Sequence, residues 1–127
     1  MLPSLLAALC LPSWAQPGDP CKKQDNTLEI NACAAHVLKQ KDAELNQAYQ
    51  DLLKTLKPAD KNDRTDYTAI RKELAEAQRA WITFRDRDCG ATYKYWEEGS
   101  IRGIKYLACL TDRTEQRTRE LRKWAAI

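Results

Sequence analysis

The sequence is poor in the residues that strand-rich folds, metal sites and hydrolytic centres need. Its 127 residues include four glycines, five prolines and a single histidine, His36. Scarce glycine and proline favour long helices over a fold of short strands and turns. The lone histidine and the absence of any CxxC pair argue against a zinc site and against a nucleophile activated by a histidine base. We therefore expect neither an enzyme nor a protein that carries a metal or another cofactor.

Charge and hydropathy exclude two further classes of protein. The formal net charge is +3, from 21 basic and 18 acidic residues, and no basic block is long enough for a nucleic-acid-binding surface. The apolar run over residues 1–15 is too short to span a bilayer. The sequence therefore predicts no nucleic-acid partner and no membrane anchor. The alternative is a lipid anchor at Cys10, although Leu9 stands before it where a lipoprotein site has a small residue.

Residues 1–15, MLPSLLAALCLPSWA, resemble a secretory signal peptide. They form an apolar core that ends in small residues, as at a cleavage site, although no positive residue precedes the run. We expect this segment to be removed, which would place the protein in the periplasm or outside the cell. The alternative is a partly buried apolar arm. Residues 16–26 then form a polar N-terminal arm rich in turn formers.

Beyond residue 15 the chain has four cysteines: Cys21, Cys33, Cys89 and Cys109. An even number of cysteines in a small exported protein favours disulfide bonds over free thiols. Four cysteines allow three pairings, so the choice among them depends on how the helices are arranged.

Hydrophobic residues recur at helical spacing in three segments. Asn26 and Glu29 form a capping-box pattern before the first, and Trp81 and Phe84 belong to the apolar rhythm of the second. The expected helices run from about 27 to 56, 65 to 97 and 101 to 124, with a charged loop at 57–66. The sequence therefore predicts an all-α fold: a three-helix up-down-up bundle of long antiparallel helices in a single domain, residues 27–127.

Gly99 and Ser100 mark the turn between the second and third helices. Gly99 suits the C′ position, where a left-handed backbone is favoured, and Ser100 suits the N-cap of the next helix. Cys89 lies ten residues before Gly99 and Cys109 lies ten residues after it. In an antiparallel helical hairpin around Gly99 the two cysteines face each other, so we predict that they form a disulfide.

Such a disulfide requires Cα atoms about 5.5 Å apart, closer than packed helix axes normally come, so its neighbours should be small. Gly90, Ala91 and Ala108 meet this condition. By elimination, Cys21 pairs with Cys33 and ties the arm to the start of the first helix.

The same register directs Arg85 toward the third helix, near Arg113. A guanidinium held inside the bundle needs an acceptor, either Asp112 or a group on the first helix such as Asp42. We interpret Arg85 and the nearby Trp81 as structural residues rather than binding residues.

The tip of the predicted hairpin collects residue types that suit a protein interface. Aromatic and arginine side chains are enriched among the residues that dominate binding energy, and a rigid hairpin lowers the cost of ordering them. The alternative is that these aromatic residues pack the end of the bundle beneath the arm. The candidate partner-binding residues are Tyr93, Tyr95, Trp96, Glu97, Glu98, Ser100, Arg102 and Tyr106.

Four stretches of the chain carry a family pattern: CKKQDNTLEINAC, DAELNQAYQDLL, AQRAWITFRDRDC and EGSIRGIKYLACLTDRTEQRTREL. Together they resemble the LprI-type family of small exported bacterial proteins, which is named for lysozyme inhibition. One departure is Glu98, which stands before Gly99 where the family often has a second glycine. The resemblance implies structural roles for Thr27, Asp42, Asn46, Tyr49, Gln78, Trp81, Arg85, Gly99 and Arg117.

The resemblance also implies a helical exported protein and, for some members, inhibition of lysozyme, which requires occlusion of a cleft that contains two carboxylates. A chain of net charge +3 gains no long-range attraction to a basic lysozyme, although Glu97 and Glu98 offer local acidic contacts. A second hypothesis stays open: a non-inhibitory envelope or stress-related module of the periplasm that binds another partner. The sequence alone sets neither the partner nor the oligomeric state.

Overall fold

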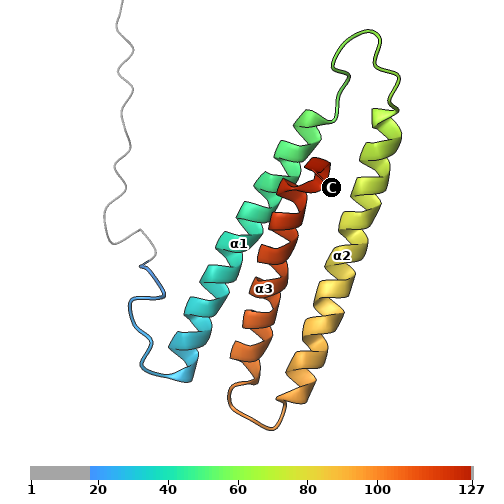
Figure 1. Ribbon diagram of the computed structural model, residues 1–127. Helices are drawn as coiled ribbons and strands as arrows, with labels where there is room; N and C mark the ends of the chain where they lie inside the picture. Colours follow the sequence, from blue (N-terminus) through green and yellow to red (C-terminus); the bar gives the residue numbers. More distant parts are fainter. Residues whose placement is uncertain (1–17, 127) are drawn as a thin grey trace, which may run out of the picture.

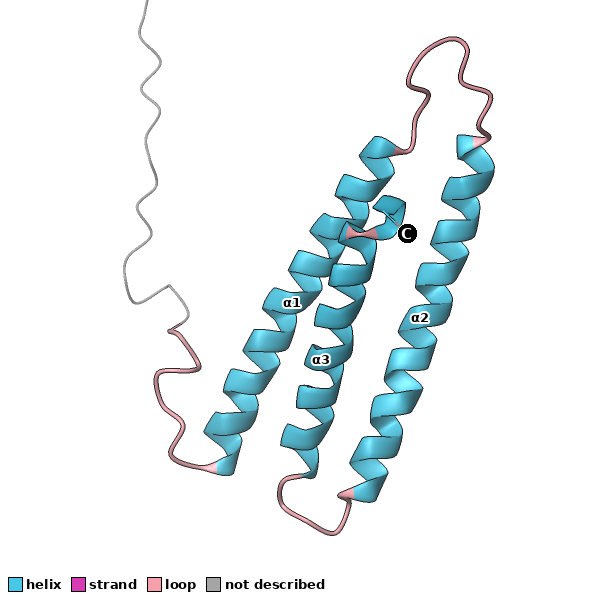
Figure 2. Ribbon diagram, in the orientation of Figure 1, coloured by secondary structure: helices cyan, strands magenta, loops and turns pink. Residues whose placement is uncertain are grey.

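A computed structural model describes residues 18–126, so the predicted signal peptide lies outside the described residues. Three helices run up, down and up (Figure 1), and residues 18–126 contain no strand (Figure 2). The predicted all-α three-helix bundle is confirmed. The elements are α1 (Thr27–Thr55), α2 (Tyr67–Tyr95), α3 (Arg102–Arg122) and the short 3-10 helix η2 (Trp124–Ala126).

The central helix of the bundle is α3. It packs closely along both α1 and α2, whereas α1 and α2 approach each other much less closely (Figure 1). Parts of α2 therefore stay open to solvent even where the sequence places large apolar residues. Ile82 is 42% exposed and Phe84 is 58% exposed.

The hydrophobic core lies in the half of the bundle away from the α2–α3 turn. Its leucines are each at most 7% exposed, and burial of a leucine stabilises a fold by about 1.5–3 kcal/mol. Partly buried aromatic residues, including Tyr49 and Trp124, pack around this cluster. The cluster consists of Leu45, Ala48, Leu52 and Leu56 on and just after α1, Leu74 on α2 and Leu121 on α3.

Side-chain caps begin the first two helices. The side chain of Asn26 accepts a hydrogen bond from the backbone N–H of Glu29 at 2.9 Å, as the capping-box pattern predicts. The Glu29 carboxylate, however, accepts from the N–H of Asp25 rather than from that of Asn26. At the start of α2 the side chain of Asp66 accepts from the N–H of Ala69 at 2.9 Å. A short polar side chain therefore satisfies one of the free N–H groups at the start of each of these helices.

The loop between α1 and α2 is organised around Asp63. Its carboxylate accepts hydrogen bonds from the Tyr67 hydroxyl at 2.7 Å and from the backbone N–H groups of Thr65 at 3.0 Å and Ala59 at 3.2 Å. These donors, the Tyr67 hydroxyl first, favour the charged form and hold the pKa of Asp63 well below its usual range. The same hydrogen bond raises the pKa of Tyr67.

Both predicted disulfides are present. The arm disulfide, Cys21–Cys33, has a Cα–Cα distance of 4.6 Å, and the hairpin disulfide, Cys89–Cys109, has one of 5.5 Å. Cys89 is fully buried. A Cβ placed on Gly90 would meet no atom within 4 Å, so the expectation that Gly90 must be small for the helices to approach was wrong.

The turn between α2 and α3 differs from the prediction. Gly99 does not have a left-handed backbone, and the N-cap position of α3 is Ile101, without a side-chain hydrogen bond, rather than Ser100. The chain leaves α2 through tight turns, in which the N–H of Gly99 donates to the carbonyl of Trp96 at 2.9 Å. Such bonds between residues three apart keep the backbone right-handed and satisfy the last carbonyls of the helix. A left-handed glycine and a serine cap are therefore not needed.

Candidate functional site

The candidate site is the hairpin tip, which we define as residues 93–106. It closes the lower end of the bundle in Figure 1, where α2 ends and α3 begins. α1 also begins at this end, so the arm disulfide lies at the same end of the bundle. The hairpin disulfide lies just behind the tip and links the two helices that carry it. All eight candidate partner-binding residues fall within this segment.

One pair of tip aromatics joins the two helices. The rings of Tyr93 on α2 and Tyr106 on α3 meet edge to face, with centroids 6.0 Å apart, and both residues are half-buried. The guanidinium of Arg102 lies 5.9 Å from the centre of the Tyr93 ring and donates a hydrogen bond to the carbonyl of Glu97 at 2.9 Å. Edge-to-face rings and a cation over a ring are both attractive arrangements. These residues fix the shape of the tip.

A second aromatic pair lies farther out. Tyr95 is 82% exposed, and its ring meets that of Trp96 edge to face at 5.3 Å. The ammonium of Lys105 lies 4.7 Å from the centre of the Trp96 ring, so α3 supports this residue from behind. Tyr95 thus presents a large amphipathic surface to solvent, and the Trp96 ring beside it is held by Lys105 of α3.

The charged residues of the tip differ in how they are held. Glu97 pairs with Lys94 at 3.4 Å. Glu98 and Ser100 are exposed, and neither side chain has a hydrogen-bond or ion-pair partner within the described part of the chain. Glu98, the residue that departs from the family pattern, is therefore a carboxylate that is available to a partner.

Away from the tip, Arg85 connects all three helices. From α2 its guanidinium donates to Asp42 on α1 and to Thr114 on α3, each at 3.2 Å, and it lies 5.2 Å from the centre of the Trp81 ring. Thr114 is fully buried and donates its own hydroxyl to the carbonyl of Leu110 at 2.7 Å. Of the two acceptors that the register suggested, Asp42 is confirmed.

The other suggested acceptor, Asp112, instead accepts a hydrogen bond from Arg113 at 2.9 Å. A further polar contact links α2 and α3 where Arg117 donates to the side chain of Gln78 at 3.0 Å. The remaining motif residues lie on α1: Tyr49 packs against the core, and Thr27 and Asn46 are exposed. Most motif residues therefore take part in contacts between helices, and these contacts lie away from the hairpin tip.

One set of potential metal ligands comes together within residues 18–126: Asp88, Cys89 and Cys109, with ligand atoms within 4.8 Å of one another. The two sulfurs are joined in the hairpin disulfide, whereas the thiolate is the form of cysteine that binds metals. Asp88 accepts a hydrogen bond from Arg113 at 2.9 Å. The group is therefore a disulfide beside an ion pair.

Sequence periodicity misplaced one large residue. Phe84 belongs to the apolar rhythm of α2, yet it lies 58% exposed beside a groove between α2 and α3. Its position next to Trp81 in the stripe gave no signal of this, because periodicity does not say how many neighbouring helices cover a face.

Comparison with known proteins places the chain among its relatives. The family model described as lysozyme inhibitor LprI matches residues 19–121. The chain belongs to this family. The resemblance drawn from the cysteines and motifs is therefore confirmed, and the family is named for an inhibitor rather than for an enzyme.

One relative has similar length. The uncharacterised protein R02472 of Rhizobium meliloti (strain 1021) is 32% identical over 124 residues, which covers 94% of this chain and 89% of the relative. No solved structure matches the chain. No helix in residues 18–126 is long and apolar enough to cross a membrane.

Proposed function

We propose that this protein is exported and inhibits a lysozyme by placing its hairpin tip in the substrate cleft of the enzyme. The observation that carries the proposal is the LprI family match over residues 19–121, which includes the whole tip. The geometry of the tip then supplies a reason to choose this part of the surface.

The tip suits a cleft in both shape and chemistry. A lysozyme cleft binds a sugar chain and holds two catalytic carboxylates. Tyr95 and Trp96 offer amphipathic rings of the kind that dominate interfaces, and Tyr95 is 82% exposed. Arg102 and Lys105 carry charge opposite to that of the cleft carboxylates. An exposed aromatic turn flanked by cations can thus enter the cleft and exclude substrate.

Rigidity supports the same proposal. The hairpin disulfide and the Tyr93–Tyr106 pair hold α2 and α3 together at the base of the tip. Side chains that are already ordered lose less entropy when they bind, so more of the contact energy appears as affinity. A mild positive charge of +3 provides no steering toward a basic enzyme, so affinity must come from these local contacts.

Export is the second part of the proposal. Two disulfides in a chain of 127 residues are typical of proteins that fold in an oxidising compartment. We therefore place the protein in the periplasm or outside the cell, where lysozymes act on the cell wall. Fractionation of cells that express the full chain, followed by alkylation of free thiols, measures both the compartment and the state of the cysteines.

The test of inhibition is a titration of the purified, oxidised protein against chicken-type, invertebrate-type and goose-type lysozymes in a cell-wall turbidity assay. Inhibition of one type at near-stoichiometric concentration is expected. Tyr95→Ala and Trp96→Ala should each weaken inhibition by about tenfold or more, as at a typical hot spot. Glu98→Lys should also weaken it, because Glu98 is the exposed carboxylate that would meet the basic surface of the enzyme around the cleft. Ile82→Ala, on the middle of α2 and 42% exposed, is the matched control and should leave inhibition unchanged.

Two results would contradict the proposal in different ways. Inhibition that survives all three tip substitutions would show that another surface contacts the enzyme. Failure to inhibit any lysozyme type, with folded protein and both disulfides intact, would reject the inhibitor function. The alternative would then be a non-inhibitory envelope or stress-related module that binds another partner.

A further inference from the structure

The outer face of α2 carries apolar side chains that no part of the described chain covers. Ala77, Ala80 and Phe84 lie on this face at spacings of three and four residues, and all three are exposed. Phe84 also lines a groove of about 440 Å³ between α2 and α3. Its other lining residues are Trp81, Gln116 and the charged residues Asp88, Arg113 and Glu120. Phe84 is 58% exposed in the middle of a long helix, and a partner that removed its ring from water would gain the free energy of burying that apolar surface.

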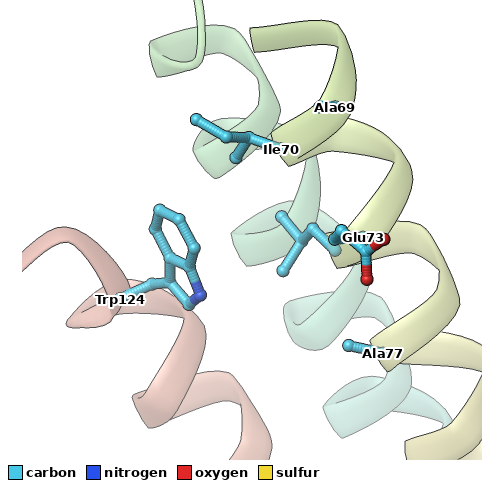
Figure 3. Close-up of a pocket in the computed structure, with 6 residues that line it drawn as sticks. Ala69, Ile70, Glu73, Ala77 and Trp124 are labelled. Atoms are coloured by element: carbon cyan, nitrogen blue, oxygen red, sulfur yellow. The ribbon is translucent and has the colours of Figure 1, made fainter. Parts of the chain in front are cut away.

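The same face continues toward the far end of the bundle. Figure 3 shows Trp124, just after α3, opposite Ile70, Glu73 and Ala77 on α2, where the side chains enclose a groove of about 450 Å³. Ala77 lies between the two grooves, four residues from Trp81 and seven from Phe84. Apolar side chains therefore recur along α2 from Ile70 to Phe84, beside grooves whose walls also carry charged residues.

Charges on this face are arranged symmetrically. Glu73 lies seven residues before Ala80, and Arg87 lies seven residues after it. Both side chains are exposed, and neither takes part in an ion pair within residues 18–126. Opposite charges at equal distances from a central small residue are what a helix needs to recognise a second copy of itself in the antiparallel direction.

We propose that a second copy of this chain covers the outer face of α2, with the two α2 helices antiparallel about a two-fold axis at Ala80. Residues equally far before and after Ala80 then oppose each other, so Glu73 faces the partner's Arg87, and the symmetry forms the same pair twice. A two-fold interface is isologous and therefore needs such self-complementarity. The small side chain of Ala80 lets the two helices come close at the axis.

The packing of Phe84 follows from the same arrangement. A helix offers holes bordered by residues at i, i+3, i+4 and i+7. One such hole on α2 is formed by Glu73, Glu76, Ala77 and Ala80, and in the proposed pair it lies opposite the partner's Phe84. The two alanines leave room for the ring, so each phenylalanine is a knob that fills a hole in the other copy.

The size of this face sets the expected strength. The contacts argued here run from Glu73 to Arg87, which is about 22 Å along the helix, so a contact stripe about 10 Å wide covers roughly 220 Å² per chain. Stable complexes bury about 800 Å² per partner. The structure therefore points to a weak dimer that forms in a concentration-dependent way.

Sedimentation equilibrium of the purified, oxidised protein from about 1 μM to 1 mM covers the range in which such dimers form. The expected result is a reversible monomer–dimer equilibrium. Phe84→Glu should weaken it by about 100-fold or more, because the charge enters the hole at both symmetric positions. Phe84→Ala should weaken it less. Ile82→Glu places the same charge on another face of α2 and should leave the equilibrium unchanged, while circular dichroism checks the fold of each variant.

A charge exchange tests the register directly. Glu73→Arg alone and Arg87→Glu alone should each weaken dimer formation by about tenfold, because like charges then face each other twice. A mixture of these two variants should form heterodimers at nearly the original strength, since every facing pair is again of opposite sign. A protein that stays monomeric at all concentrations, a dimer insensitive to Phe84→Glu, or a mixture with no rescue would overturn the proposal.

Discussion

Replacement of Arg85 by alanine tests which contact holds the three helices in register. Arg85 is the side chain through which α2 reaches both Asp42 on α1 and Thr114 on α3, and only 15% of it is exposed. α1 and α2 otherwise meet near the loop between them, where Arg71 on α2 donates to the carbonyls of Leu53 and Leu56. We therefore expect Arg85 to fix the position of α2 in the middle of the bundle. Its loss should therefore lower the free energy of unfolding by much more than the loss of a surface arginine.

The magnitude follows from the contacts one by one. The ion pairs with Asp42 and Asp86 together contribute at most about 1 kcal/mol, because these side chains are 44% and 51% exposed and their carboxylates can be solvated again. The hydrogen bond to the buried Thr114 contributes about 1–2 kcal/mol. The contact with Trp81 adds about 0.5–1 kcal/mol. We expect Arg85→Ala to cost about 2–4 kcal/mol, a large part of the stability of a small domain.

The assay is urea unfolding of the oxidised protein, followed by circular dichroism. Arg79→Ala is the control. Arg79, on the same helix, is 66% exposed, and among the described residues its side chain pairs only with Glu76 at the surface, so its loss should cost at most about 0.5 kcal/mol. Arg85→Lys should recover only part of the loss, since an ammonium does not present the planar fork of a guanidinium. Equal midpoints for Arg85→Ala and Arg79→Ala would refute the reasoning.

Other predictions concern the backbone, the loop and the disulfides. Gly90→Ala should raise the free energy of unfolding by about 0.5–1 kcal/mol in urea melts, because Gly90 is inside α2 and a Cβ there meets no atom within 4 Å. Asp63→Asn should destabilise the protein at neutral pH. The difference in the free energy of unfolding between the two proteins should shrink below about pH 4. The pKa of Asp63 is lower in the folded than in the unfolded protein, so its charged form stabilises the fold above the unfolded pKa. This stabilisation is lost as the pH falls toward the folded pKa. Mild reductant followed by alkylation and mass spectrometry should open the arm disulfide before the hairpin disulfide, because Cys21 and Cys33 are both partly exposed whereas Cys89 is fully buried.

The sequence predicted the helices and both disulfides for identifiable reasons. Apolar residues at helical spacing report the helix itself, and each predicted helix end fell within about two residues of the observed one. The equal spacing of Cys89 and Cys109 from Gly99 required only that the hairpin be antiparallel. In an antiparallel helical hairpin the position of the turn decides which residues face each other, so the positions of the two cysteines in the sequence were enough to predict their contact.

The turn and the outer face of α2 could not be predicted in this way. A glycine before a serine is compatible with a left-handed cap, but the tight turn at Gly99 satisfies the same carbonyls with right-handed bonds, and sequence does not distinguish the two. The stripe containing Phe84 indicates an apolar face without saying which element covers it. Because α3 is the central helix, one flank of α2 has no neighbour within residues 18–126.

The two proposed surfaces occupy different parts of α2, and this separation makes them independent. Ala80, at the proposed two-fold axis, lies fifteen residues before Tyr95, which is about 22 Å along the helix. In an antiparallel pair the two hairpin tips point to opposite ends of the dimer, so each tip stays open to its own lysozyme. A monomeric Phe84→Glu protein should therefore inhibit with one enzyme bound per chain, as the dimer does, and Tyr95→Ala should lose inhibition while it still dimerises. Failure of either proposal would leave the other unaffected, because no residue that carries one takes part in the other.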